Sequence, residues 1–205
     1  MKGALQLCMF AALAACSGLP EKKHFDEKDF GEIEALMMRD FHPRGSAKMD
    51  RIAPDALQKA CNLADNAPSP EAAKALEAQQ FSTIKFPSGN LMGDWKNGQK
   101  IAQSGRGLQW NDKPGAAGGG GCYNCHQLSP QEASYGTLGP SLLGFGKQRG
   151  TSLEMQRYAY GRVYNAKAYN ACSQMPRLGY SGTLTEQQIK DVVAYLLDPA
   201  SPVNR

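Results

Sequence analysis

The sequence predicts an all-α fold, and two observations support this prediction. Several stretches repeat apolar residues every three or four positions, which is the period of an amphipathic helix, and breaks rich in Pro, Gly and Ser separate them. The motif Cys122-Tyr-Asn-Cys-His126 lies between two such stretches, and no βαβ pattern surrounds it. The 205 residues suffice for one domain with an extension, or for two small domains.

The motif Cys122-x-x-Cys125-His126 is the attachment signature of a c-type haem. Each thiol forms a thioether with one vinyl group of the porphyrin, and the adjacent imidazole becomes an axial ligand of the iron. The alternatives are a thioredoxin-like redox pair, which lacks its βαβ context here, and half of a zinc site, which lacks a second Cys-x-x-Cys or paired His. We therefore predict one covalently bound haem c, with His126 as a metal ligand.

Composition and charge exclude one class of partner. The net charge is only +4, which gives no support for nucleic-acid binding. The charge is uneven, at −3 over residues 21–40 and +5 over residues 91–205. A basic haem domain suits docking to an acidic partner. Hydrophobic residues make up 41% of the chain, and a porphyrin would add apolar core.

Residues 1–16 have the features of an export signal, with a basic residue at position 2 and a mostly apolar stretch from Leu5 to Ala15. The ending Leu13-Ala-Ala-Cys16 resembles the bacterial lipoprotein cleavage box, in which the cysteine becomes the lipidated first residue. We predict a periplasmic protein that is tethered to a membrane through Cys16. The alternative is an ordinary signal peptide in which this cysteine is incidental.

The cysteine count predicts a disulfide. Cys8 is lost with the signal, lipid modifies Cys16, and haem attachment takes two more. Cys61 and Cys172 remain as an even pair in an oxidising compartment, where disulfides persist. We predict that the two are joined, and the alternative is two unrelated buried thiols.

Residues 17–90 form a predicted helical extension. After a polar tether, residues 25–41 repeat apolar positions at helical spacing between acidic residues, and Pro43 disfavours helix beyond them. His24 and His42 flank this helix, and both are typical surface histidines rather than iron ligands.

Two further helices are predicted in the extension. One lies within residues 49–64, with Pro54 in its first turn, and the other spans residues 71–80, which are rich in alanine. Their apolar faces are narrow. We expect them to pack on the haem domain, on each other or on another subunit.

Residues 91–205 form the predicted haem domain, which begins and ends with a helix. The first lies within residues 92–105 and is capped by Asp94, although Gly98 weakens it by roughly 1 kcal/mol relative to Ala. The last begins at a capping box of Thr185 and Gln188. Its predicted buried stripe comprises Ile189, Val192, Val193 and Leu196.

Three connecting regions complete the haem domain. Residues 105–122 contain four consecutive glycines and are predicted to form a loop, which either runs close to the porphyrin or is a slack insertion. Another helix is predicted over residues 151–160. The tail over residues 200–205 is predicted to be extended.

Two residues after the motif are candidates for contacts with the haem and its histidine ligand. Pro140 keeps its carbonyl, which can accept the Nδ1 proton of His126 and fix the imidazole ring. Leu142 would then lie against the haem face. The alternative is that the Gly139-Pro140 pair forms a simple turn.

Met175 is the predicted sixth ligand of the iron. It lies in the irregular stretch Asn170-Ala-Cys-Ser-Gln-Met-Pro-Arg-Leu-Gly179, where a loop can bring the thioether to the iron. Met155 is the rival, but it occurs at helical spacing among apolar residues, where Met is normally core. Ligation by His and Met raises the reduction potential and leaves no open site, so the iron would transfer electrons and bind no substrate.

The order of these features resembles class I cytochrome c, which implies three to five helices around a covalent haem. The flanking residues resemble the SoxX family, the monohaem subunit of the SoxAX cytochrome of bacterial thiosulfate oxidation. The resemblance covers roughly residues 93–203. It depends on Gly121–Gln127, Gly139–Leu142, Asn170–Arg177 and Ile189–Pro199.

The resemblance implies a function as one subunit of an L-cysteine S-thiosulfotransferase. SoxAX joins thiosulfate to a cysteine of the SoxYZ carrier, and the reacting site lies on the SoxA subunit. SoxX would accept the electrons and pass them to a small soluble cytochrome. This implies a heterodimer with a SoxA-like c-type cytochrome, no catalytic residue in this chain, and no activity of this chain alone.

Two other functions remain open. One is a stand-alone, membrane-tethered electron carrier that serves a terminal oxidase, with the same haem residues and a different partner. The other makes residues 25–90 a docking module and the haem a structural group.

Overall fold

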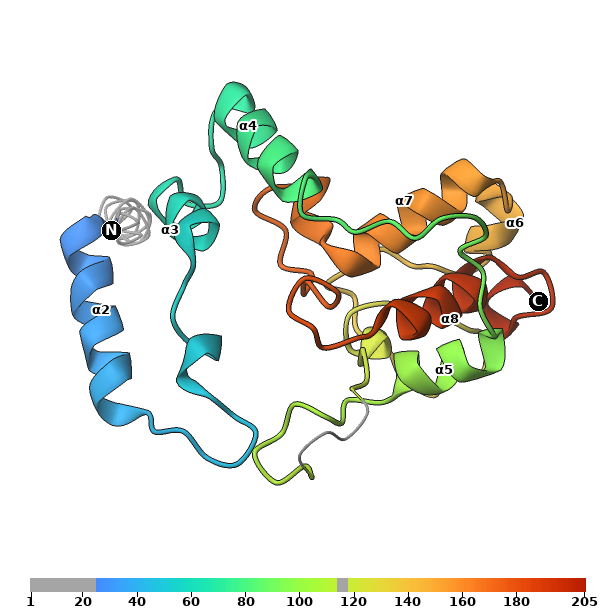
Figure 1. The fold of residues 1–205 in the computed structure, drawn as a ribbon, viewed down its shortest axis with the longest axis horizontal. Coiled ribbons are helices and arrows are strands. Elements are labelled where there is room, and N and C mark those ends of the chain that lie inside the picture. Colours follow the sequence, from blue (N-terminus) through green and yellow to red (C-terminus); the bar gives the residue numbers. More distant parts are fainter. Residues whose placement is uncertain (1–24, 114–117) are drawn as a thin grey trace, which may run out of the picture.

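The structure is a computed structural model that describes residues 25–113 and 118–205, and these residues form helices and loops without a β-strand (Figure 1). The prediction of an all-α fold is confirmed. The α-helices of this part are α2 (Glu27–Asp40), α3 (Ala56–Leu63), α4 (Pro70–Phe81), α5 (Trp95–Gln103), α6 (Phe145–Arg149), α7 (Leu153–Tyr164) and α8 (Glu186–Leu197). Short 3-10 turns are η2 (Met49–Arg51), η3 (Cys122–Asn124), η4 (Ala166–Ala168) and η5 (Pro202–Asn204).

Side-chain caps determine where most of these helices begin. The predicted capping box is present at α8, where the hydroxyl of Thr185 accepts from the amide of Gln188 at 3.3 Å and the Gln188 side chain accepts from the amide of Thr185 at 3.0 Å. Asp94 caps α5, as predicted. Such caps stabilise a helix by about 1 kcal/mol each, because they satisfy amides that have no partner within the helix.

Helices α5 and α8 lie side by side in the haem domain and contact each other closely at Gly98 (Figure 1). A Cβ atom on Gly98 would lie 2.0 Å from the backbone oxygen of Asp191, so a larger residue would force the helices apart. The carboxylate of Asp191 also accepts from the amide of Asp94 at 2.9 Å, which ties the start of α5 to α8. Gly98 therefore lowers helix propensity but permits the close packing of α5 on α8.

The main core surrounds α8. The four residues of its predicted stripe are all buried, and Tyr195 and Leu197 are fully buried beside them. Ile84 and Leu91, which precede α5 in the chain, belong to the same core. Burial of one large apolar side chain contributes about 1.5 to 3 kcal/mol, so α8 is the main source of stability in the domain.

The C-terminal tail differs from the prediction. Residues 202–204 form the turn η5 rather than an extended tail, and Val203 is buried. Asn204 explains the difference, because its Oδ1 accepts from the amide of Gly146 at 2.7 Å and its Nδ2 donates to the carbonyl of Leu196 at 3.0 Å. The tail thereby joins α6 to α8. Helix α6 itself was not predicted, since its five residues are too few to show a periodic pattern.

The second predicted helix of the extension is shorter than expected. The turn η2 and α3 are separate elements, and Asp55 caps α3 through a capping box with Gln58. Pro54 therefore lies before the cap and is not in the first helical turn, which corrects the prediction. The carboxylate of Asp55 begins the helix, and the preceding proline ends the irregular segment.

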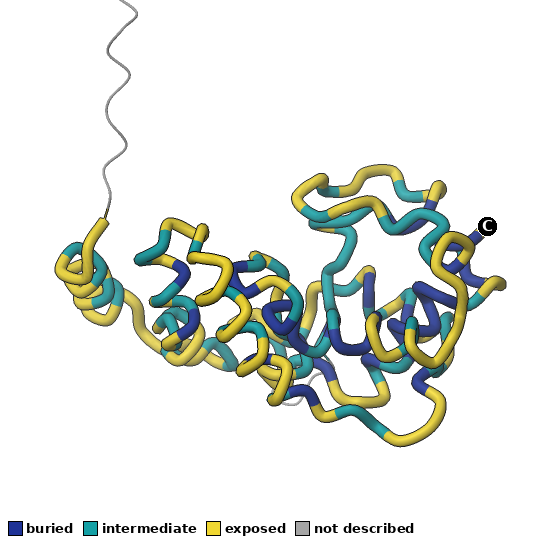
Figure 2. The backbone as a smooth tube through the Cα atoms, turned by 90° about the horizontal axis from the view of Figure 1, so that it is seen from above, coloured by how far each residue is buried: buried dark blue, intermediate teal, exposed yellow. Residues whose placement is uncertain are grey.

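Helix α2 lies at the outer edge of the extension and buries none of its residues (Figure 2). Its apolar side chains Ile33, Leu36 and Met38 are between 42% and 49% exposed. An ion pair of 3.0 Å joins Glu34 to Lys59 of α3. Within the described residues, no helix has both the length and the apolar character needed to cross a membrane.

Candidate haem site

The attachment motif forms a tight turn that places both thiols and the imidazole on one short segment. In η3, the amides of Cys125 and His126 donate to the carbonyl of Cys122 at 3.1 and 2.9 Å. Gly121 enters this turn with a positive φ of 55°, a conformation that favours glycine. Cys122 and Cys125 both carry free thiols, as haem attachment requires. Burial raises the pKa of Cys122 to about 11.

The glycine run before the motif packs closely on the protein itself. The amides of Gly119, Gly120 and Gly121 donate to carbonyls at the end of α5 and just after it, over 2.8 to 2.9 Å. A Cβ atom on Gly119 would lie 2.0 Å from the backbone oxygen of Ser104. The described part of this run, residues 118–121, is therefore not a slack insertion. It serves as a C-terminal cap of α5 that leads the chain directly into the motif.

The ring of His126 is fixed from two sides. Its Nδ1 lies 2.7 Å from the carbonyl oxygen of Pro140, which can only accept a hydrogen bond. Nδ1 therefore carries the proton, and Nε2 keeps its lone pair for a metal. Gly139 packs against the ring, since a Cβ atom there would lie 2.3 Å from Cε1. The predicted contact of Pro140 is thus present in the structure, and Gly139 is a site residue to which the sequence analysis assigned no role.

Cys122 and Tyr123 of the motif pack on the main core and are only partly buried. Other partly buried apolar residues that pack on this core are Met92, Ile101, Leu142, Tyr164 and Met175. An apolar planar group that covered such residues would extend the core. The donor set fits a porphyrin, because the motif supplies two thiols and one oriented imidazole, and Met175 supplies a thioether on the same core.

The two methionine candidates have different environments. Met175 lies in an irregular segment between η4 and α8, and it packs against the main core. Met155 lies in the first turn of α7, where its amide donates to the capping hydroxyl of Ser152 at 3.2 Å, and its side chain also packs on the core. Only the segment of Met175 has the irregular backbone that a ligand loop needs. His42 is exposed, and Cys8, Cys16 and His24 lie outside the described residues.

Comparison with known families agrees with this geometry. The family model described as "Cytochrome c" matches residues 95–198, from the first residue of α5 to the residue after α8. The chain belongs to the cytochrome c family. A covalently bound haem c and a role in electron transfer follow from this membership, and the helical arrangement is the class I cytochrome c fold. The chain is also 33% identical over 214 aligned residues to an uncharacterized lipoprotein of Aquifex aeolicus (strain VF5), and the alignment covers 100% of both chains.

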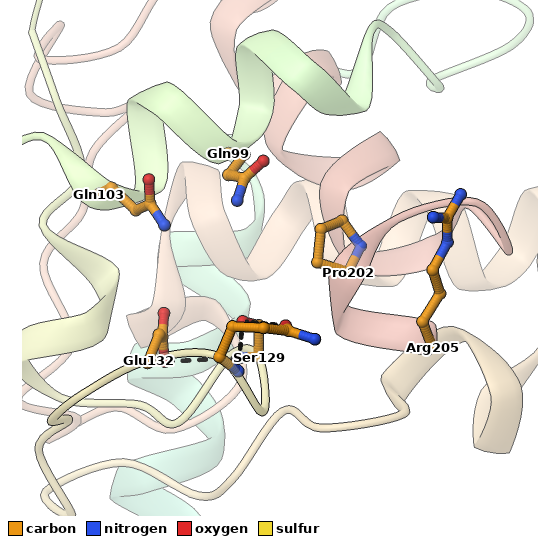
Figure 3. A pocket seen from close by; sticks show the side chains of 7 residues that line it. Gln99, Gln103, Ser129, Glu132, Pro202 and Arg205 are labelled. Carbon is orange, nitrogen blue, oxygen red and sulfur yellow. Dashed lines mark hydrogen bonds between the residues drawn. The ribbon is translucent and has the colours of Figure 1, made fainter.

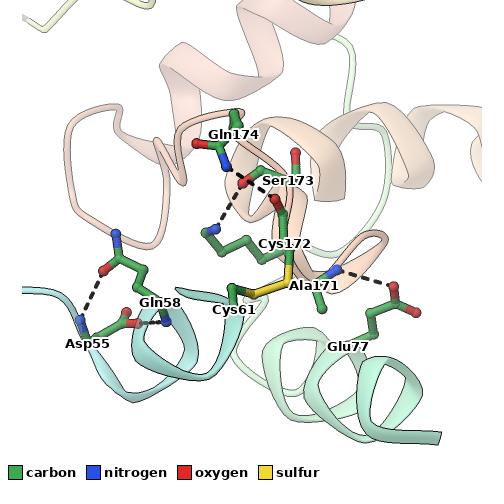
Figure 4. Close-up of a disulfide and its surroundings, with 9 residues drawn as sticks. Asp55, Gln58, Cys61, Glu77, Ala171, Cys172, Ser173 and Gln174 are labelled. Atoms are coloured by element: carbon green, nitrogen blue, oxygen red, sulfur yellow. Dashed lines mark hydrogen bonds between the residues drawn. A yellow bond between two sulfur atoms is a disulfide. The ribbon is translucent and has the colours of Figure 1, made fainter. Parts of the chain in front are cut away.

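A disulfide connects the extension to the cytochrome domain. The sulfur atom of Cys61 in α3 is bonded to the sulfur atom of Cys172 (Figure 4). Cys172 precedes Met175 by three residues. Of the cysteines in the described residues, only the pair in the haem motif is free. The predicted pairing is therefore present in the structure. No group of three Cys, His, Asp or Glu side chains in the described part of the chain could hold another metal ion.

A polar cavity of about 300 Å³ lies beside α5 (Figure 3). One carboxylate oxygen of Glu132 accepts from the amides of Leu128 and Ser129 at 3.0 and 3.4 Å, while the other is buried without a partner. The lining residues are Gln99, Gln103, Ser129, Gln131, Glu132, Pro202 and Arg205. None of the predicted haem contacts lines this cavity, and its polar walls do not suit a porphyrin.

Proposed function

We propose that this cytochrome is the electron-relay subunit of a SoxAX-type complex. The observation that carries the proposal is the use of its cysteines. Within the described residues, two are in the haem motif and two form the disulfide, so no thiol remains for reaction with a sulfur substrate. A chain that can take up electrons but has no reactive thiol fits a relay subunit whose partner holds the reacting site.

Three residues of this chain would provide the iron ligation that an electron relay needs. Pro140 orients His126 through the bond at Nδ1, and Met175 would supply a second, neutral ligand. The haem supplies one-electron oxidation and reduction when bound. His126 and Met175 together would hold the iron and leave no position for a substrate, which suits electron transfer without ligand exchange.

The proposed reaction occurs on the partner. Thiosulfate and the cysteine thiol of a SoxYZ carrier form one S–S bond, and the thiol loses its proton while two electrons leave. A single haem accepts one electron at a time, so this chain passes on two electrons in succession to a small acceptor cytochrome. The complex would be an L-cysteine S-thiosulfotransferase, and this chain alone would be inactive.

The proposed location is the periplasmic face of a membrane. The Leu13-Ala-Ala-Cys16 box and the full-length similarity to a protein described as a lipoprotein support lipidation at Cys16. A lipid at this cysteine would precede the polar stretch over residues 17–24 and the extension. Mass spectrometry of the mature N-terminus tests this proposal: an acylated Cys16 is expected, and an unmodified N-terminus beyond residue 16 would contradict it.

The decisive experiment is purification of the native protein in mild detergent. A larger c-type cytochrome in equal amount is the expected result, and the isolated complex should then oxidise thiosulfate in the presence of the carrier. A lone monohaem protein would contradict the proposal and would support a stand-alone electron carrier. A Cys16→Ser variant with an ordinary signal peptide serves as the control, because it should lose the membrane tether and keep the partner.

A further inference from the structure

The segment that carries Met175 is irregular, and within the haem domain Lys167 of η4 donates to its Ser173 carbonyl at 2.8 Å. Residues 169–178 lie between η4 and the turn before α8 and contain no helix. One local bond supports the ligand directly, from the amide of Met175 to the hydroxyl of Ser173 at 3.2 Å. An irregular loop of this kind opens easily unless other elements hold it.

The extension holds this segment on the side that precedes Met175. The disulfide of Cys61 fixes position 172 to α3, across a sequence separation of 111 residues. The carboxylate of Glu77 in α4 accepts from the amide of Ala171 at 3.2 Å (Figure 4). The backbone just before Met175 is therefore attached to both α3 and α4.

The extension also holds the segment on the side that follows Met175. The guanidinium of Arg177 forms an ion pair with Asp55, the cap of α3, and donates to the Oε1 atom of Gln80 in α4 at 3.3 Å. The side chain of Arg177 is only 13% exposed. Gln80 is itself buried and accepts from the side chain of Asn165 at 3.1 Å, so its position is well determined.

We infer that α3 and α4 serve as a brace that positions the Met175 segment and keeps its sulfur available to the iron. Asp55, Cys61, Glu77 and Gln80 are positioning residues in this arrangement, because they contact the loop and not the haem motif. The inference rests on the assignment of Met175 as the second axial ligand in the proposed function. Loss of the brace should let the loop open more often, with a lower reduction potential and easier access of other ligands to the iron.

Cyanide binding to the oxidised holoprotein tests this inference, because cyanide can bind only when the methionine sulfur leaves the iron. A charge-assisted hydrogen bond that is lost changes an opening equilibrium by about tenfold. The binding rate should therefore rise by about that factor in Glu77→Ala, and by about fivefold or less in Asp55→Asn, because the carboxylate of Asp55 is partly exposed. Asn remains a good cap for α3, so the first variant keeps the helix intact. The variant Glu77→Gln keeps an acceptor oxygen for the amide of Ala171 but loses the charge, so it should bind cyanide more slowly than Glu77→Ala.

Arg51→Ala is the matched control. Arg51 belongs to the extension and donates to the carbonyl of Leu108 at 2.5 Å, away from the Met175 segment. Its loss should leave cyanide binding unchanged. Equal acceleration in this control and in the brace variants would overturn the inference, since it would indicate general loosening of the extension.

Met175→Ala distinguishes a wrong ligand assignment from a wrong brace inference. If this variant binds cyanide fast and the brace variants do not, the ligand assignment stands and the brace is wrong. If Met175→Ala itself leaves the rate and the spectrum unchanged, the ligand assignment fails, and the brace inference fails with it. If both kinds of variant bind cyanide faster, with the control unchanged, the inference is supported.

Discussion

His126 and Met175 are held in different ways. The imidazole of His126 is fixed by residues 13 and 14 positions later, through the packing of Gly139 and the carbonyl of Pro140. The segment of Met175 is fixed by residues that precede it by about a hundred positions, through a disulfide, an ion pair and side-chain hydrogen bonds from α3 and α4.

The two segments therefore depend on different parts of the fold. The segment with the attachment motif can form as soon as a short stretch of chain folds, because its contacts are local. The segment that carries Met175 depends on the docking of the extension, because its contacts close long loops and this closure has an entropic cost. Four predictions test or refine this comparison, from the largest expected effect to the smallest.

The substitution Gly139→Ala should have the largest effect on the haem site, because its Cβ atom would overlap the ring of His126. Displacement of the ring breaks the bond to Pro140 and removes the orientation of the imidazole on which iron ligation depends. We expect a large loss of correctly ligated holoprotein, measured as covalent haem per polypeptide and by the ligand-dependent spectrum. Gly105→Ala is the control, since nothing lies within 4 Å of a Cβ atom there. Equal yields of the two variants would disprove the close packing at Gly139.

The substitution Met175→Ala should lower the reduction potential and weaken haem stability. Axial ligands set potentials over a range of about 0.8 V, and we expect a fall on the order of 0.1 V when the thioether is lost. Redox titration measures the potential. Met155→Ala is the control, because this residue packs on the core and should affect stability while the potential stays constant. An unchanged potential and spectrum in Met175→Ala would show that the ligand is another residue.

Replacement of both cysteines of the disulfide by serine should destabilise the holoprotein by about 3 kcal/mol, because the bridge restricts a long loop in the unfolded chain. Denaturant unfolding followed at the haem band and by far-ultraviolet circular dichroism measures the change. We expect the haem to remain attached, since Cys122 and Cys125 lie in the attachment motif, whose contacts are local. An unchanged unfolding midpoint would mean that α3 stays docked without the bridge.

Loss of the ion pair between Asp55 and Arg177 should have the smallest effect on the free energy of unfolding. This effect should depend on pH. Burial raises the pKa of this carboxyl, but the amide of Gln58 and the guanidinium of Arg177 outweigh burial, and the net pKa is lowered. A lowered pKa in the folded state contributes stability above the unfolded value of about 3.9, and this stability is lost as the pH falls through that range. The pair is partly exposed, so we expect about 1 kcal/mol or less.

The measurement for this pair is the difference in unfolding free energy between the wild type and Asp55→Asn as a function of pH. The difference should be fully present at neutral pH, should begin to decrease near the unfolded pKa of about 3.9, and should disappear as the pH falls through the lower pKa of the folded state. A difference that stays constant down to pH 3 would show that the charge of Asp55 does not contribute.

Features that depend on short spacing could be predicted from the sequence. The attachment motif, the caps at Asp94 and Thr185 and the buried stripe of α8 each occupy a few neighbouring residues, and local geometry determines them. The contact of Pro140 with His126 belongs to the same class. The turn of the C-terminal tail was missed, because Asn204 acts through partners in α6 and at the end of α8 that no local pattern indicates.

The sequence by itself predicted the covalent haem and the cytochrome c family, because two thiols at this spacing with an adjacent imidazole form the attachment signature of a c-type haem. The cysteine count also predicted the pairing of Cys61 with Cys172. Only the tertiary structure showed what this disulfide does in the fold. It also showed the roles of Gly98, Gly139 and Gln80. These residues act through close contacts between segments far apart in the chain, and such contacts follow from packing rather than from spacing.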